Sequence, residues 1–289
     1  LLLAGKGASV DMLVMTATPI PRTLTLTVYG DMDLSVLDEK PPGREPVDTR
    51  AVALNRLDEV VAGLRRAVEA GARAYWVCPL VEESEKLAAA AAEERYASLK
   101  ESLGPRVGLV HGRMKAEQKD RVMEAFAAGE IDVLVATTVI EVGVDVPEAT
   151  VMVIEHAERF GLSQLHQLRG RVGRGGRKGT CLLLYAEPLG ETARARISVL
   201  RQTDDGFRIA EEDLRLRGAG DLLGTRQSGL PSFRLADIAA HQDLMLAARD
   251  DARLVLERDP ELTGERGRAL RVLLYLFERD AAIRYLRSG

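Results

Sequence analysis

One stretch decides the fold: "VGLVHGRMKAEQKDRVMEAFAAGEIDVLVATT" (107–138). It opens with a short apolar run, continues with helix-forming residues over 115–128, and ends on a second apolar run. Two β-rich runs joined by a helix are typical of a strand–helix–strand unit, in which the strands lie parallel in one sheet. The stretch therefore predicts a parallel sheet.

The same alternation continues on both sides. Four more runs read as strands: "VDTRAVAL" (47–54), "ARAYWVCPLV" (72–81), "TVMVIE" (150–155) and "TCLLLY" (180–185). A helical apolar face separates the first two, made of Leu57, Val60, Val61, Leu64 and Val68 and followed by Gly71. Apolar strands alternating with helices indicate a sheet covered on both faces, so an α/β domain is expected over 50–186.

The flanking regions differ in character from this domain. Residues 10–20 predict a buried strand that runs into a proline turn, and "DEKPPGREPVDT" (38–49) predicts a linker. Helices are expected to dominate from about residue 190. Near the end of the chain, Leu270, Leu273, Leu274 and Phe277 have the spacing of a core-facing helix.

Composition limits the classes of function. The 289 residues suggest about two domains, and a net charge of −4 argues against a general basic coat for nucleic acid. No apolar stretch approaches the ~18 residues of a membrane span. Cys78 and Cys181 lie in apolar runs and are predicted to be buried, reduced thiols, which suits the cytoplasm.

A basic, glycine-rich segment, "HQLRGRVGRGGRKG" (166–179), raises a question of chemistry. Within it, Gln167, Arg171 and Arg174 are spaced i, i+4 and i+7, so a helix over 162–172 would present all three on one face. Glycines at 170 and 173 would permit close approach of another backbone. Arginines held in this way suit either a polyphosphate or a solvated basic patch on nucleic acid.

A second segment, "ATTVIEVGVDVPEA" (136–149), follows a predicted strand. Thr137 and Thr138 end that strand, where ligands of open sheets collect. Gly143 lets a ligand approach the backbone, and Asp145 is suited to a ribose hydroxyl or to orienting an arginine. The plain alternative is a turn with a capping aspartate.

Together these segments resemble helicase superfamily 2. "TATPIPRT" (16–23) is similar to motif III, 137–147 to motif V and "QLHQLRGRVGRG" (164–175) to motif VI. Within the superfamily, 16–44 resembles the RecG family, and 204–229 resembles the TRG translocation motif that RecG shares with the transcription-repair coupling factor. The resemblance implies a second RecA-like parallel-sheet lobe followed by a mainly helical region.

The resemblance also implies roles for single residues. The residues implied to act in catalysis are Arg171, Arg174 and Gln167. The residues implied to bind the nucleotide are Gly143 and Asp145. Coupling of nucleotide state to movement is implied for Thr16, Thr18, Arg196, Arg217 and Gln227. Contact with nucleic acid is implied for Arg113, Thr137 and Thr138. The cofactors are ATP and Mg²⁺, bound mainly by a first lobe, because this sequence contains no G-x-x-x-x-G-K-[ST] loop; no metal ligand is assigned.

The implied division is 1–37 (end of a first RecA-like lobe), 38–49 (linker), 50–189 (second lobe), 190–235 (TRG-like hairpin and loop) and 236–289 (helical). The implied function is that of a carboxy-terminal half of a monomeric ATP-dependent double-stranded DNA translocase. Such an enzyme remodels stalled forks and Holliday junctions, and an amino-terminal wedge and first lobe are its expected further parts. The alternatives are a transcription-repair coupling translocase and, for the isolated chain, a non-catalytic DNA-binding lobe.

Overall fold

The computed structural model describes residues 45–79, 85–137, 146–224 and 241–277, with a few single positions before residue 44. The chain divides into one compact part over 35–218 and another made of 1–34 and 219–289. The strand predicted over 10–20 and most of the 38–49 linker lie outside the described residues.

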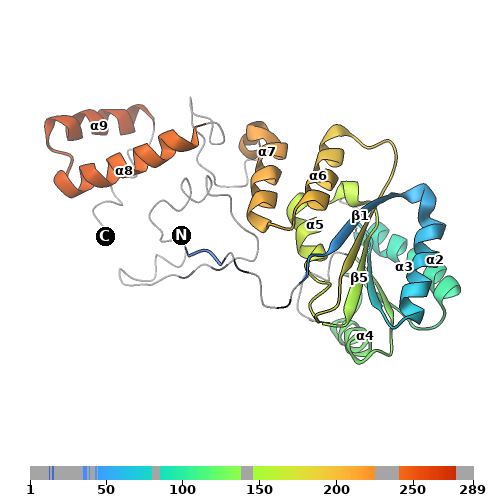
Figure 1. Ribbon diagram of the computed structural model, residues 1–289. Helices are drawn as coiled ribbons and strands as arrows, with labels where there is room; N and C mark the ends of the chain where they lie inside the picture. The colour runs from blue at the N-terminus through green and yellow to red at the C-terminus, as the bar shows by residue number, and fades with distance from the viewer. Residues whose placement is uncertain are drawn as a thin grey trace. The chain divides into compact units, whose positions relative to one another are not determined.

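The first part is built on six parallel strands (Figure 1). They are β1 (Asp48–Ala53), β2 (Arg73–Val77), β3 (Val107–Val110), β4 (Val133–Ala136), β5 (Ala149–Ile154) and β6 (Thr180–Tyr185). Their order across the sheet is β1-β6-β5-β2-β4-β3, and every neighbouring pair is parallel. All six β-rich runs predicted from the sequence are therefore confirmed as strands of one sheet.

Helices cover both faces of this sheet, as Figure 1 shows. One face carries α2 (Leu57–Glu69) and α3 (Glu85–Leu103); the other carries α4 (Ala116–Ala128), α5 (Leu162–Arg169), α6 (Glu191–Gln202) and the start of α7 (Gly206–Gly224). Successive residues of β2 alternate between the two cores, Tyr75 facing the α5 side and Trp76 the α2 side. This alternation follows from the strand period of two.

Local signals set the ends of several elements. Helix α2 ends at Glu69, just before Gly71, where the sequence predicts its end. The φ of Gly71 is 86°, in the left-handed region typical of a residue that follows a helix. Helix α7 begins where the Asp205 carboxylate accepts hydrogen bonds from the backbone N–H groups of Phe207 and Arg208. Cys78 and Cys181 are buried and unpaired, and burial raises the pKa of each thiol to about 12. Within the described ranges, no helix has the length and apolarity that crossing a membrane requires.

The second part contains α8 (Gln242–Arg258) and α9 (Glu265–Leu276). Between them, the Asp259 carboxylate accepts hydrogen bonds from the backbone N–H groups of Thr263 and Gly264. The predicted helix is present, but the prediction that its apolar face points into a core is wrong: Leu273 is 49% exposed and Phe277 41% exposed. Periodicity identifies residues that share a face, and it carries no information about what covers that face.

Candidate functional site

The arginine segment follows α5. Gln167 lies on the helix and is exposed, but the helix ends at Arg169. The prediction of one helix that presents Gln167, Arg171 and Arg174 on a single face is therefore wrong beyond Arg169. After Arg169 the backbone N–H groups of Arg171 and Val172 donate to carbonyls only three residues back, which is no longer the α-helical pattern. The φ of Gly173, 72°, then lies in the left-handed region, so the helix cannot continue to Arg174. Arg171 and Arg174 instead occupy a tight loop.

Close backbone packing holds this loop against the sheet. The N–H of Gly173 donates to the carbonyl of Ala149 at the start of β5, over 3.2 Å. A Cβ on Gly173 would lie 3.2 Å from the Gly179 nitrogen, and a Cβ on Gly175 would lie 2.6 Å from the Pro147 carbonyl oxygen. The close approach predicted at Gly173 is confirmed. The arginine loop thus lies at the amino edge of the strands.

The two arginines are held differently. Arg174 is exposed, and its Nε donates to the carbonyl of Gly170 over 2.9 Å. Arg171 is half-buried, and its backbone N–H donates to the carbonyl of Leu168 over 3.0 Å. Because its Nε is anchored, the Arg174 guanidinium has a fixed direction, which suits the binding of an anion.

Gly173 and Gly176 form a matched pair for testing this packing, since their φ angles are 72° and 73° but only Gly173 is crowded. Gly176→Ala is expected to destabilise the chain by about 1–2 kcal/mol through its backbone conformation alone. Gly173→Ala should cost roughly a further 1–3 kcal/mol from the contact with Gly179. Urea unfolding followed by the fluorescence of Trp76, the single tryptophan of the sequence, measures both. Equal costs would show that the loop is loosely packed.

The opposite edge of the sheet carries the predicted nucleic-acid residues. Thr137 follows β4 and is 1% exposed, and its N–H donates to the carbonyl of Val110. Next to it along the edge, His111 follows β3, and Arg113 is exposed. Within the described residues, the Thr137 hydroxyl and the His111 Nδ1 have no hydrogen-bond partner. The His111 Nε2 lies 3.4 Å from a Glu93 carboxylate oxygen.

The structure therefore separates the predicted site residues into two groups. Arg171 and Arg174 lie at the amino edge, whereas Arg113 and Thr137 lie at the carboxyl edge. Seven predicted residues lie outside the described residues or have side chains that do: Thr16, Thr18, Thr138, Gly143, Asp145, Arg217 and Gln227. A sheet with distinct groups on its two edges can hold two ligands without direct contact between them.

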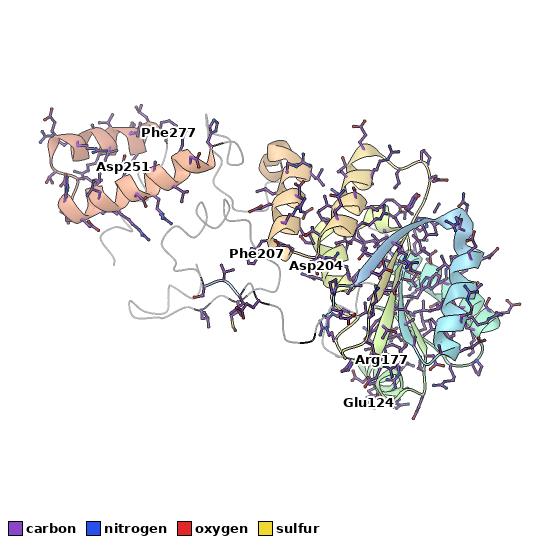
Figure 2. All side chains as sticks on the ribbon, viewed as in Figure 1. Glu124, Arg177, Asp204, Phe207, Asp251 and Phe277 are labelled. Carbon is purple, nitrogen blue, oxygen red and sulfur yellow. The ribbon has the colours of Figure 1, made fainter. Side chains whose placement is uncertain are left out.

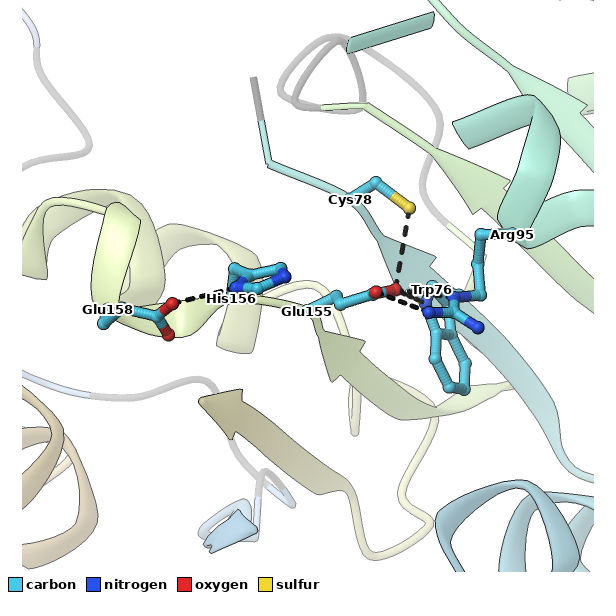
Figure 3. Close-up of polar contacts among 6 residues, drawn as sticks. All are labelled: Trp76, Cys78, Arg95, Glu155, His156 and Glu158. Carbon is cyan, nitrogen blue, oxygen red and sulfur yellow. Dashed lines mark hydrogen bonds and ion pairs between the residues drawn. The ribbon is translucent and has the colours of Figure 1, made fainter. Parts of the chain in front are cut away.

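A buried polar cluster at the carboxyl ends of β2 and β5 was missed by sequence reasoning (Figure 3). Arg95 of α3 donates from Nε and Nη2 to the two carboxylate oxygens of Glu155, over 2.8 and 2.7 Å. The Trp76 indole donates to the same carboxylate over 2.9 Å. The Arg95 guanidinium also lies 5.7 Å from the Trp76 ring centroid. One feature of the sequence that could have pointed to this cluster is Glu155, a carboxylate directly after the apolar run of β5.

The cluster keeps Glu155 ionised. Burial alone would raise the pKa of the Glu155 carboxyl, but the hydrogen bonds from Arg95 and Trp76 outweigh it and hold that pKa below its usual value. The hydrogen bonds to Glu155 also raise the pKa of Arg95. The ion pair therefore fastens α3 to the carboxyl edge, next to the predicted nucleic-acid residues.

Helices α6 and α7 form the predicted helical hairpin, with Asp204 and Phe207 at its turn (Figure 2). Arg196 lies on α6, and its buried Nε has no hydrogen-bond partner among the described residues. On α7, Arg215 donates to Glu212 over 2.8 Å, and the two form an ion pair one turn apart. A cavity of about 240 Å³ lies between the helices, lined by Ala195, Ser198, Val199, Gln202, Thr203, Arg208, Glu212 and Arg215.

Two family models match the chain. The Helicase conserved C-terminal domain matches residues 54–176, which include β2 to β5, helix α5 and the arginines of the loop that follows it. The model described as ATP-dependent DNA helicase RecG, domain 3, C-terminal matches residues 203–271. The first matched range lies in the α/β lobe and the second in the helical region that follows it in the chain.

Curated relatives are similar over most of the chain. An ATP-dependent DNA helicase RecG of Acidithiobacillus ferridurans is 54% identical over 257 residues, covering 89% of this chain and 38% of the relative. The relative of the same name from Thermotoga maritima is 49% identical over 265 residues, covering 91% and 34%. The chain thus spans less than two fifths of the length of these relatives.

A solved structure, "Structure of RecG bound to three-way DNA junction", matches with a TM-score of 0.65 and 49% sequence identity. The match covers 82% of this chain and 30% of that chain. Motifs, fold and comparisons agree: the chain is RecG-like and corresponds to the carboxy-terminal portion of RecG proteins.

Proposed function

We propose that this chain is part of an ATP-dependent double-stranded DNA translocase that remodels branched DNA, such as stalled replication forks and Holliday junctions, in repair and recombination. One observation carries the proposal: the exposed Arg174 is braced at the edge of the sheet where β1 begins, beside Gly179, whose carbonyl accepts the N–H of Asp48. Residues 45–47, the described part of the predicted linker before β1, thus reach the same edge as the arginine loop. A lobe joined through that segment is well placed to bring a nucleotide to it.

The proposed ATP site is composite. A first RecA-like lobe would hold most of the ATP and Mg²⁺, and Arg171 and Arg174 would meet the phosphate oxygens, with Gln167 positioning them. The exposure and Nε anchor of Arg174 fit this role, since a fixed guanidinium stabilises charge that develops during phosphoryl transfer. Gly143 and Asp145 belong to the same proposed site.

The proposed DNA track runs along the carboxyl edge, with Arg113, Thr137 and Thr138 at the phosphates. Coupling between the two edges is assigned to Thr16, Thr18, Arg196, Arg217 and Gln227. The RecG names of the relatives support both assignments, and the solved RecG–junction complex supports branched DNA as the partner. The domain boundaries at 37/38, 49/50, 189/190 and 235/236, the monomeric state, the wedge and first lobe as further parts, and the cytoplasm as compartment belong to this proposal.

The full-length protein tests the proposal directly. Its ATPase should be stimulated by a three-way DNA junction, and absence of stimulation would contradict the assignment. Binding to RNA polymerase would favour a transcription-repair translocase instead. Retained DNA binding without any ATPase would favour a non-catalytic lobe.

The DNA track makes a separate prediction for Arg113. In the full-length protein, Arg113→Ala should weaken binding to junction and linear duplex alike, and should reduce the slope of log affinity against log salt by about 1. Fluorescence anisotropy over a series of salt concentrations measures the slope. Arg177→Ala is the matched control, since Arg177 is exposed in the loop at the opposite edge. A larger change of the slope for Arg177→Ala than for Arg113→Ala would indicate that DNA binds at the amino edge of the sheet instead.

A further inference from the structure

Arg169 ends α5, two residues before Arg171, and is only 3% exposed. Its Nη1 donates to the carbonyls of Leu200 and Thr203, over 2.6 and 2.9 Å, and its Nη2 lies 3.0 Å from the His166 Nδ1. Both carbonyls are at the carboxyl end of α6. The last carbonyls of a helix lack intrahelical partners and carry partial negative charge, so a cation there is doubly favourable.

A second contact ties the other end of α5. Ser163, in the first turn, donates from its hydroxyl to the Asp213 carboxylate of α7 over 3.1 Å. Asp213 is 6% exposed, and its negative charge lies near the amino end of α5, where the helix dipole favours it. Leu165 and Leu168 of α5 share one apolar core with Leu200 of α6 and Ile209 of α7. Helix α5 is thus bonded to the hairpin at both ends and packed against it between them.

We infer that Arg169 is a positioning residue, which with Ser163 ties the Arg171–Arg174 loop to the α6–α7 hairpin. An apolar side chain would fill the same space. Only a planar guanidinium, however, bridges two carbonyls and an imidazole at once, and so fixes both the distance and the angle between α5 and α6. A displacement of the hairpin therefore displaces the start of the arginine loop.

The inference rests on the proposed function, because its readout is the ratio of the ATPase rate with a three-way junction to the rate without DNA, in the full-length protein. Arg169→Met should lower this ratio about 5- to 100-fold, the usual range for coupling between sites. Loss of folded protein lowers both rates equally and leaves the ratio unchanged. The ratio therefore separates positioning from a purely structural role.

Three further variants sharpen the test. Arg169→Lys keeps the charge and should restore part of the ratio, and Ser163→Ala should lower it by a smaller factor. Arg201→Met is the matched control, because Arg201 is exposed on the last turn of α6. Should Arg169→Met not fold, Arg169→Lys and Ser163→Ala still decide the question.

An unchanged ratio in the Arg169 and Ser163 variants, with stimulation intact in the unsubstituted protein, overturns this inference alone. A lowered ratio in Arg201→Met to the same extent would also overturn it, since the effect would not then be specific to the buried contact. An unsubstituted protein without DNA stimulation contradicts the proposed function, and the inference with it.

Discussion

Replacing Arg174 with alanine in the full-length protein is expected to lower DNA-stimulated ATP turnover by about 10³–10⁵-fold, the range that arginine fingers contribute. The affinity for junction DNA should stay nearly unchanged, because Arg174 lies at the amino edge of the sheet and the proposed DNA track lies at the carboxyl edge. Steady-state ATPase assays and anisotropy titrations on the same preparation measure both quantities.

Arg177→Ala is the control for Arg174→Ala, since it removes the same charge from the same exposed loop. Turnover of that variant should remain within about twofold of the unsubstituted protein, as expected for a side chain outside the composite site. Equal losses of turnover and DNA affinity in Arg174→Ala would instead identify the loop as a basic DNA-binding patch. That was the alternative left open by the sequence.

The largest effect on stability is expected at the Arg95–Glu155 pair. Arg95→Met leaves a buried carboxylate whose remaining side-chain donors in Figure 3 are the Trp76 indole, at 2.9 Å, and the weaker Cys78 thiol, at 4.0 Å. Removal of one partner from a buried pair typically costs about 3–5 kcal/mol. Glu155→Gln should cost less, because the Arg95 side chain is 20% exposed and can turn toward water. Urea unfolding followed by tryptophan fluorescence gives both free energies.

The pH dependence of the Arg95→Met effect has a definite sign. The folded-state pKa of Glu155 is lowered, so the stabilisation from this pair is present above the unfolded pKa of about 4.3 and is lost as the pH falls through the folded value. The difference between Arg95→Met and the unsubstituted chain should therefore be largest near neutral pH and should narrow below about pH 4. A difference independent of pH would mean that the loss is one of packing.

The exposed pair Arg56–Glu59 is the matched control for this effect. It is also joined by two hydrogen bonds, of 2.9 and 2.6 Å, but the Arg56 side chain is 59% exposed. Exposed pairs gain little in water, so Arg56→Met should change the unfolding free energy far less than Arg95→Met.

Sequence patterns were sufficient for the sheet and insufficient for the ends and contacts of its helices. The six strands were predictable because each is a short β-rich run bounded by turns or helices, and five of them, β2 to β6, contain buried apolar residues. The end of α5 was not, since the spacing of Gln167, Arg171 and Arg174 is compatible with a helix. The helix nevertheless ends at Arg169, and the left-handed backbone of Gly173 prevents its continuation to Arg174. The exposed face of α9 shows the same limit, because a periodic pattern does not identify a neighbour.

Contacts between residues that are far apart in the sequence were also not predicted. Arg95 and Glu155 are 60 positions apart, and neither has a local pattern that points to the other. The same holds for Arg169 and the carbonyls of α6, because backbone acceptors are invisible in a sequence. The arginine loop itself was found because its residues are close together in the chain and resemble a known motif.

The length of the strands has a mechanical consequence. β5 is six residues long, or about 20 Å, and its hydrogen bonds to strands on both sides make it stiff. A rotation of about 10° about one rim of such a plate swings the other rim through about 3.5 Å, close to the ~3.4 Å by which a DNA duplex rises along its axis per base pair. In the proposed translocase, a small hinge motion on the ATP side would thus match an advance of a single base pair.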